Sequence, residues 1–267
     1  MLHLTPMDPF GVRIAVARDD GIPQSLSQLA EEEIDQLRDL LADHGVLVMH
    51  DPDLDDQGFA TLLRRFGPLI FTAGEAPVPH EPSLNVISNV GRERPPVSRW
   101  HTDTSYVSSP PSYTALRAIR VPEQGGETLF SDQAVALDTL DQELSAAVVG
   151  RTITHVVTGV DPGEEQERQA VHPIVRPHPR TGRPALYLST RDRCASVSGL
   201  SADAGRGLVD RLLTHATQDH TVLRHRWMPG DVVMWDNARV LHRGDHSDVV
   251  GDRVFHRGMV GAQGYRS

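Results

Sequence analysis

Apolar residues recur at helical spacing in the first part of the chain. Residues 26–44 carry leucines three to four positions apart, and Gly45 follows them as a typical C-terminal cap. This pattern predicts a helix that leads into a short buried strand, "VLVMH". Similar spacing predicts further helices over residues 56–66, 133–140, 141–149 and 201–218, the last with Ser201 as its cap.

After residue 84 the pattern changes to short apolar stretches separated by turn residues. Strands are predicted at 84–89, 112–120, 127–131, 151–157, 172–178, 185–189, 222–227, 231–236 and 253–260. Many short strands with a few helices are typical of a sandwich or barrel. No glycine-rich dinucleotide-binding motif follows a strand, so a Rossmann domain is not expected. We expect one mainly β domain with flanking helices over residues 1–267.

Charge and cysteine content narrow the function further. The net charge of −10 argues against a nucleic-acid surface. All 26 basic residues are arginine, so lysine chemistry is excluded and the permanent cations are guanidiniums, which suit oxyanion binding. Cys194 is the sole cysteine, and neither a signal peptide nor a bilayer-length apolar run is seen. A cytoplasmic protein without membrane contact is expected.

Three side chains have the chemistry of a metal site. His101 and Asp103 are two residues apart, so in an extended segment both point to one face. His242, after the strand "DVVMWD", is the candidate third ligand, although His246 lies close by. Two imidazoles and one carboxylate leave metal positions open, as in non-haem Fe(II) oxygenases. Among 14 histidines and 36 acidic residues a chance His-x-Asp pair is expected, so an ordinary surface or core histidine is the alternative.

Several ordered motifs extend this pattern from about Gly45 to Gly261. They are "WHTDTSY", "GGETLFSD", "HPIVRPHPRTGRPALYLS" and "MPGDVVMWDNARVLHRG", followed by Arg253 and Arg257. Together they resemble the taurine dioxygenase (TauD/TfdA) family of Fe(II)- and 2-oxoglutarate-dependent dioxygenases. The resemblance implies a double-stranded β-helix (jelly roll) and iron on His101, Asp103 and His242. It also implies that Arg253 and Thr128 bind the distal carboxylate of 2-oxoglutarate, with Arg257 near the iron-bound end.

The resemblance further implies oxidation of an unactivated C–H bond with O2 as cosubstrate and release of succinate and CO2. Asp103 favours oxygenation, because related halogenases have a small residue there. Hydroxylation is the default outcome, and desaturation, epoxidation or cyclisation use the same site. Two alternatives remain open at this point: a cupin-like hydrolase or isomerase using Zn or Mn, and a jelly roll that binds ligands without turnover. A homo-oligomer is expected from the resemblance alone.

The segments that flank the motifs depart from the taurine-specific pattern, which favours another small-molecule substrate. Arginines fall in two of these segments, and we hypothesise that some bind an anionic group; solvated loop arginines are the alternative. Trp100 beside the ligand and the displaced His80 are further candidates. The candidate substrate residues are Arg92, Arg94, Arg99, Arg191 and Arg193, with Trp100 and His80. The absence of lysine and the low aromatic content favour a role in specialised metabolism, and no residue of the sequence identifies the substrate.

Overall fold

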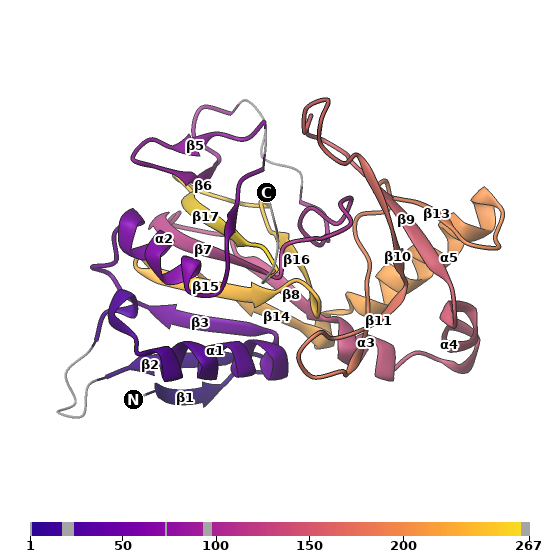
Figure 1. The fold of residues 1–267 in the computed structure, drawn as a ribbon, viewed down its shortest axis with the longest axis horizontal. Coiled ribbons are helices and arrows are strands. Elements are labelled where there is room, and N and C mark those ends of the chain that lie inside the picture. The colour runs from indigo at the N-terminus through magenta and orange to yellow at the C-terminus, as the bar shows by residue number, and fades with distance from the viewer. Residues whose placement is uncertain (1, 18–23, 73, 93–97, 263–267) are drawn as a thin grey trace.

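The computed structural model describes residues 2–17, 24–72, 74–92 and 98–262 (Figure 1). Its helices are η1 (Leu26–Gln28), α1 (Glu31–His44), α2 (Asp56–Arg64), α3 (Gln133–Asp138), α4 (Gln142–Val148), α5 (Ala202–Ala216) and η2 (Asp219–Thr221). Its strands are β1 (Leu2–Pro6), β2 (Val12–Val16), β3 (Val46–His50), β4 (Leu69–Ile70), β5 (Pro77–Val78), β6 (Glu81–Ser88), β7 (Tyr113–Arg120), β8 (Thr128–Asp132), β9 (Thr152–Val156), β10 (Gln169–Pro173), β11 (Val175–Pro177), β12 (Pro184–Leu186), β13 (Cys194–Val197), β14 (Val222–His225), β15 (Asp231–Asp236), β16 (Val240–Gly244) and β17 (Val254–Val260).

Two sheets build the body of the protein. The larger has the strand order β1-β2-β3-β15-β7-β17-β6-β5, with β4 paired to β17, and the smaller has the order β14-β8-β16. All of these pairs are antiparallel except β2 with β3. Neighbours in the sheets are far apart in sequence, so residues from distant segments are brought to one site.

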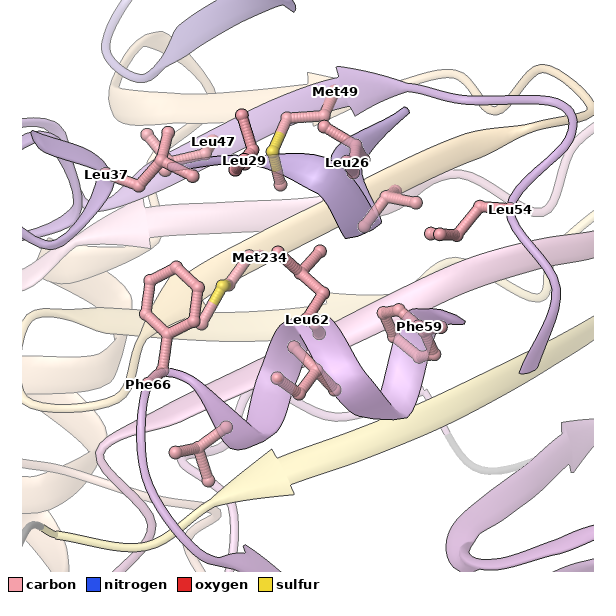
Figure 2. Close-up of a cluster of buried hydrophobic side chains, with 14 of the residues drawn as sticks. Leu26, Leu29, Leu37, Leu47, Met49, Leu54, Phe59, Leu62, Phe66 and Met234 are labelled. Carbon is pink, nitrogen blue, oxygen red and sulfur yellow. The ribbon is translucent and has the colours of Figure 1, made fainter. Parts of the chain in front are cut away.

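Alternation along the strands sends side chains to opposite faces of the larger sheet. On β15, Val233 and Trp235 join a buried cluster that also contains Phe130 of the smaller sheet. Val232 and Met234 point the other way, into a cluster closed by α1 and α2. Figure 2 shows this second cluster, in which Met234 lies close to side chains of α2. The larger sheet is thus buried on both faces, which fixes the register of its central strands.

A third cluster lies at the other end of the molecule. The sheet β10-β9-β13 and the helices α4 and α5 lie on the right in Figure 1. Apolar residues of α5, such as Val209 and Leu212, pack with Ile153 of β9 and with Leu241 of β16. This contact joins the outer sheet to the strand that carries His242.

The predicted helices and most predicted strands are confirmed, and the chain is mainly β. The first helix was predicted from residue 26 but α1 begins at Glu31, because a separate 3₁₀ turn occupies Leu26–Gln28. The stretch 172–178 divides into β10 and β11. The pattern missed β1, β2, β4, β5, β13 and β16; β1, for example, is an edge strand whose side chains are mostly exposed, so it lacks an apolar period. The expectation of one domain over residues 1–267 stays a prediction.

Within the described residues, no helix is long and apolar enough to cross a bilayer.

Candidate functional site

The segment containing His101 is joined by backbone hydrogen bonds to β16, which contains His242. The His101 amide donates to the His242 carbonyl at 2.9 Å, and the reverse bond is 3.0 Å long. The two imidazole rings therefore lie side by side, with their centroids 4.1 Å apart. Asp103 follows where the chain turns, and Thr104 next to it has a positive φ of 46°. The extended geometry expected of this segment ends at that turn, which directs the carboxylate toward both rings.

The three candidate metal ligands converge. Asp103 Oδ1 lies 3.6 Å from His101 Nε2, and Asp103 Oδ2 lies 3.7 Å from His242 Nε2. One donor atom from each residue falls within 4.8 Å of the others, and no other group of three such side chains converges in the described part of the chain. His246, the competing candidate, is not in this group. The side chain of His101 is 31% exposed while the other two are buried, so the site opens on the His101 side.

The protonation states suit a divalent metal. His101 Nδ1 donates to the Arg99 carbonyl at 2.8 Å, which orients the ring with Nε2 toward Asp103. Burial lowers the pKa of His242 to about 3, so this imidazole is neutral at pH 7. Burial alone would raise the pKa of Asp103, but this pKa lies well below its usual range, and the Arg257 guanidinium 3.7 Å away is the permanent cation that favours the ionised carboxylate. Two imidazoles and one carboxylate fit ferrous iron with open positions.

A buried hydrogen-bond chain orients the carboxylate. Thr114 of β7 donates its hydroxyl proton to Asp103 Oδ2 at 2.8 Å. Asn237, which follows β15, donates to Thr114 Oγ1 at 2.9 Å. Both residues are buried. The sequence interpretation missed both, although Asn237 stands in the quoted "WDN" motif and Thr114 carries no comparable signal.

Replacing Thr114 by valine is expected to weaken metal binding about 10- to 100-fold, because groups that orient a metal ligand are typically worth that much. Valine keeps the volume but cannot donate to Asp103. Titration of the metal-free protein with Fe(II) under anaerobic conditions measures the change. Thr139→Val, at an exposed hydroxyl at the end of α3, is the matched control and should bind Fe(II) as the unchanged protein does. Equal affinities for the two variants would show that the hydrogen bond does not position Asp103.

A second polar pocket surrounds Arg253. Its side chain is only 3% exposed, and its guanidinium donates to the Gly126 carbonyl at 2.9 Å and to Thr128 Oγ1 at 3.3 Å. Burial lowers the pKa of Arg253 to about 10, so it remains a cation at neutral pH. No carboxylate of the described residues pairs with it. Trp227 also donates to Thr128 Oγ1, at 3.0 Å. Because this hydroxyl accepts two hydrogen bonds, its own proton is available to a bound ligand.

The two glycines of "GGETLFSD" allow this pocket to form. Gly126 has a φ of +75°, and a Cβ there would stand 2.8 Å from Pro122 and 3.1 Å from the Arg253 side chain. A larger residue would be strained at this φ and would press on both Pro122 and the Arg253 side chain. A buried cation beside a free hydroxyl proton is a site for a carboxylate.

Arg257 of β17 lies between the metal ligands and a third charged group. Its Nη1 is 3.7 Å from Asp103 Oδ1, and its Nη2 forms an ion pair with Glu75 and contacts Thr72. Glu75 stands in the segment between β4 and β5, which the sequence interpretation treated only as a departure from the taurine-specific pattern. The cation expected near the metal is therefore present, but a carboxylate already pairs with it.

The candidate substrate residues do not all reach the site. Arg99 pairs with Asp192 and Arg191 pairs with Asp210, and both arginines are exposed at the surface. Arg92 and His80 are also exposed, and Arg94 lies outside the described residues. Trp100 is half-buried and packs under Arg243, 5.2 Å from the ring centroid. Arg193 is different, because it donates at 3.1 Å to the carbonyl of Thr102, between two of the metal-ligand candidates.

Cys194 is buried, and burial raises the pKa of its thiol to about 12. It is therefore unsuited to act as a nucleophile, as expected.

Comparison with known proteins agrees with this geometry. The family model described as taurine catabolism dioxygenase TauD, TfdA family matches residues 3–259. The α-ketoglutarate-dependent 2,4-dichlorophenoxyacetate dioxygenase of Cupriavidus pinatubonensis is 33% identical over 258 residues, which cover 86% of this chain and 88% of that protein.

Solved structures show the same fold. A taurine dioxygenase from Burkholderia xenovorans has a TM-score of 0.82 at 26% identity, covering 98% of this chain and 91% of that one. AAD-2 in complex with Mn(II) and N-oxalylglycine, a 2-oxoglutarate analogue, has a TM-score of 0.83 at 26% identity, covering 98% of each chain. The expected jelly roll is confirmed.

Proposed function

This chain belongs to the TauD/TfdA family and is an Fe(II)- and 2-oxoglutarate-dependent dioxygenase, and from that premise we propose that His101, Asp103 and His242 bind the iron. The observation that carries this assignment is the convergence of three donors within 4.8 Å. The orientation of the His101 ring, the neutrality of His242 and the ionised carboxylate of Asp103 support it.

We propose that 2-oxoglutarate places its distal carboxylate against Arg253 and Thr128. The cation and the available hydroxyl proton together match one carboxylate, and no carboxylate from the described residues competes for the guanidinium. Trp227 would orient the hydroxyl rather than contact the ligand. Arg257, beside Asp103, would stand near the iron-bound end of the cosubstrate.

When bound, iron with 2-oxoglutarate and O2 supplies the oxidant that breaks a C–H bond, and we propose that succinate and CO2 are released. The protein's own contribution is to orient the reactants relative to one another and to exclude water from the active site. Hydroxylation is the proposed outcome, and desaturation, epoxidation and cyclisation are the outcomes that product analysis would separate from it.

Relatives of this chain act on small molecules, and those named above act on 2,4-dichlorophenoxyacetate and taurine, both of which carry an acidic group. We propose that this enzyme also takes a small anionic substrate, in specialised metabolism. We further propose a cytoplasmic location and a homo-oligomer, without nucleic-acid or membrane partners. The negative net charge of −10 supports the exclusion of nucleic acid.

Anaerobic addition of Fe(II) and 2-oxoglutarate to the protein is expected to give a weak visible charge-transfer band, and admission of O2 is expected to give succinate. A cupin-like hydrolase or isomerase would give neither signal, and a jelly roll without turnover would give the band but no succinate. A succinate-release screen over amino acids, sulfonates, phosphonates and natural-product intermediates would then identify the substrate. If neutral compounds react well and anionic ones do not, the proposed substrate class is wrong.

A further inference from the structure

Arg193 is a half-buried cation beside the metal site with no carboxylate partner among the described residues. Its Nη1 donates to the Thr102 carbonyl, and its guanidinium lies over the ring of Tyr106, 5.3 Å from the centroid. Its Nε is buried and has no hydrogen-bond partner in the described part of the chain. Burial lowers the pKa of Arg193, and the nearby Asp103 opposes that shift. Keeping a guanidinium in such a position costs free energy unless an anion joins it.

Arg257, the other cation beside Asp103, is already neutralised. It forms an ion pair with Glu75, and both side chains are mostly buried, at 12% and 22% exposure. The segments carrying Glu75 and Arg193 lead into β5 and β13, which lie on opposite sides of β16 in Figure 1. Arg257 approaches Asp103 itself, with Nη1 3.7 Å from Oδ1, and Arg193 donates to the carbonyl of the preceding residue, Thr102, so both cations flank the same ligand segment.

When Fe(II) and 2-oxoglutarate are bound, the positive and negative charges around the site balance without Arg193. Ferrous iron brings two positive charges, and Arg253 and Arg257 add one each. The 2-oxoglutarate dianion brings two negative charges, and Asp103 and Glu75 add one each. These charges cancel, since an imidazole bound to a metal ion is neutral, and the charge of Arg193 alone remains.

Building on the proposed function, we propose that Arg193 binds the acidic group of the substrate, that this group carries a single negative charge, and that Glu75 prevents Arg257 from binding it. A carboxylate, sulfonate or sulfate monoester meets this requirement, because each presents two oxygens to the planar guanidinium. A phosphonate or phosphate dianion would leave one negative charge uncompensated. The Tyr106 ring holds the guanidinium in place while it binds.

The test measures binding, so it does not require the natural substrate. Two series of compounds, one with a benzyl and one with a propyl body, are each prepared as the neutral methyl sulfone, the sulfonate monoanion and the phosphonate dianion. Calorimetry follows their binding to the protein loaded with Fe(II) and 2-oxoglutarate under anaerobic conditions, at a pH where the phosphonate is doubly ionised. We expect the sulfonate to bind most tightly in at least one series.

Arg193→Gln is expected to lower sulfonate affinity by about 30-fold, because it removes a half-buried charged partner that the bound anion would shield from water. Arg193→Lys should recover part of this loss, since it restores the charge but not the two-pronged geometry. Arg191→Gln, two residues away at an exposed ion pair, is the matched control and should leave affinity unchanged. Glu75→Gln frees Arg257 and should shift the preference from the sulfonate toward the phosphonate.

Failure of this inference differs from failure of the iron assignment. A protein that gives no charge-transfer band with Fe(II) and 2-oxoglutarate would contradict the iron assignment itself. If the band forms but the neutral sulfone binds as tightly as the sulfonate, or no compound binds, the monoanion site is wrong. The same holds if Arg193→Gln keeps the band and the full sulfonate affinity. A variant that keeps the band and loses sulfonate binding supports the proposal.

Discussion

Replacing His242 by alanine is expected to abolish Fe(II) binding and turnover. His242 supplies one of three converging donors, and its neighbours offer no substitute, since no other histidine joins the group among the described residues. Groups that merely orient a ligand are worth about 10- to 100-fold in metal affinity, so loss of a ligand itself should cost about 1,000-fold or more. Anaerobic titration with Fe(II) measures the affinity, and succinate release measures the turnover.

His246→Ala is the matched control, because the sequence alone left His246 open as the third ligand. The His246 side chain packs against Gly244 and lies outside the converging group. Iron binding and the charge-transfer band should therefore survive this change. If His246→Ala removed the iron and His242→Ala retained it, the assignment of the third ligand would be reversed.

The sequence predicted the metal site well because ligand identity is a property of individual residues. His101 and Asp103 are two positions apart, and the distance between their donors follows from local chain geometry. The approach of His242 could not be derived in that way. It depends on the pairing of β16 with the His101 segment across 141 positions of sequence, and the hydropathy pattern did not reveal β16 at all. Only the resemblance to a family supplied that contact in advance.

The supporting hydrogen bonds were less predictable. Trp227 packs against Phe255 as an apolar side chain would, but its indole N–H also donates to Thr128. Thr114 looks like any other strand residue until β7 is placed beside Asp103. A pattern of apolar and polar positions reports which side of an element is buried, and it does not report which buried donor meets which acceptor.

The arginines illustrate a similar limit. In sequence, Arg191 and Arg193 are equivalent candidates for an anionic substrate. In the structure, Arg191 is exposed and pairs with Asp210, whereas Arg193 is half-buried and pairs with no carboxylate of the described residues. The difference arises from helix α5, because Asp210 on this helix lies beside Arg191 and forms the ion pair with it. Counterions that come from distant elements cannot be assigned from composition.

Replacing Arg253 by alanine is expected to weaken 2-oxoglutarate binding with little effect on Fe(II) binding. The guanidinium is buried and charged, and it is held by Gly126 and Thr128 at the place proposed for the distal carboxylate. Loss of such a partner leaves a buried carboxylate unpaired and costs about 2–5 kcal/mol, or about 30- to several-thousand-fold in affinity. Titrating the Fe(II)-loaded protein with 2-oxoglutarate, and following the charge-transfer band, measures the affinity directly.

Two further variants show whether the loss belongs to this pocket. Arg120→Ala removes an exposed arginine paired with Asp252, and it should leave 2-oxoglutarate affinity unchanged. Trp227→Phe removes only a neutral hydrogen bond to Thr128, worth about 1 kcal/mol, so about a five-fold loss is expected. The order of effects should therefore be Arg253, then Trp227, then Arg120. Unchanged 2-oxoglutarate affinity in Arg253→Ala would place the distal carboxylate elsewhere, because a buried cation that contacts a dicarboxylate cannot be removed without loss of binding.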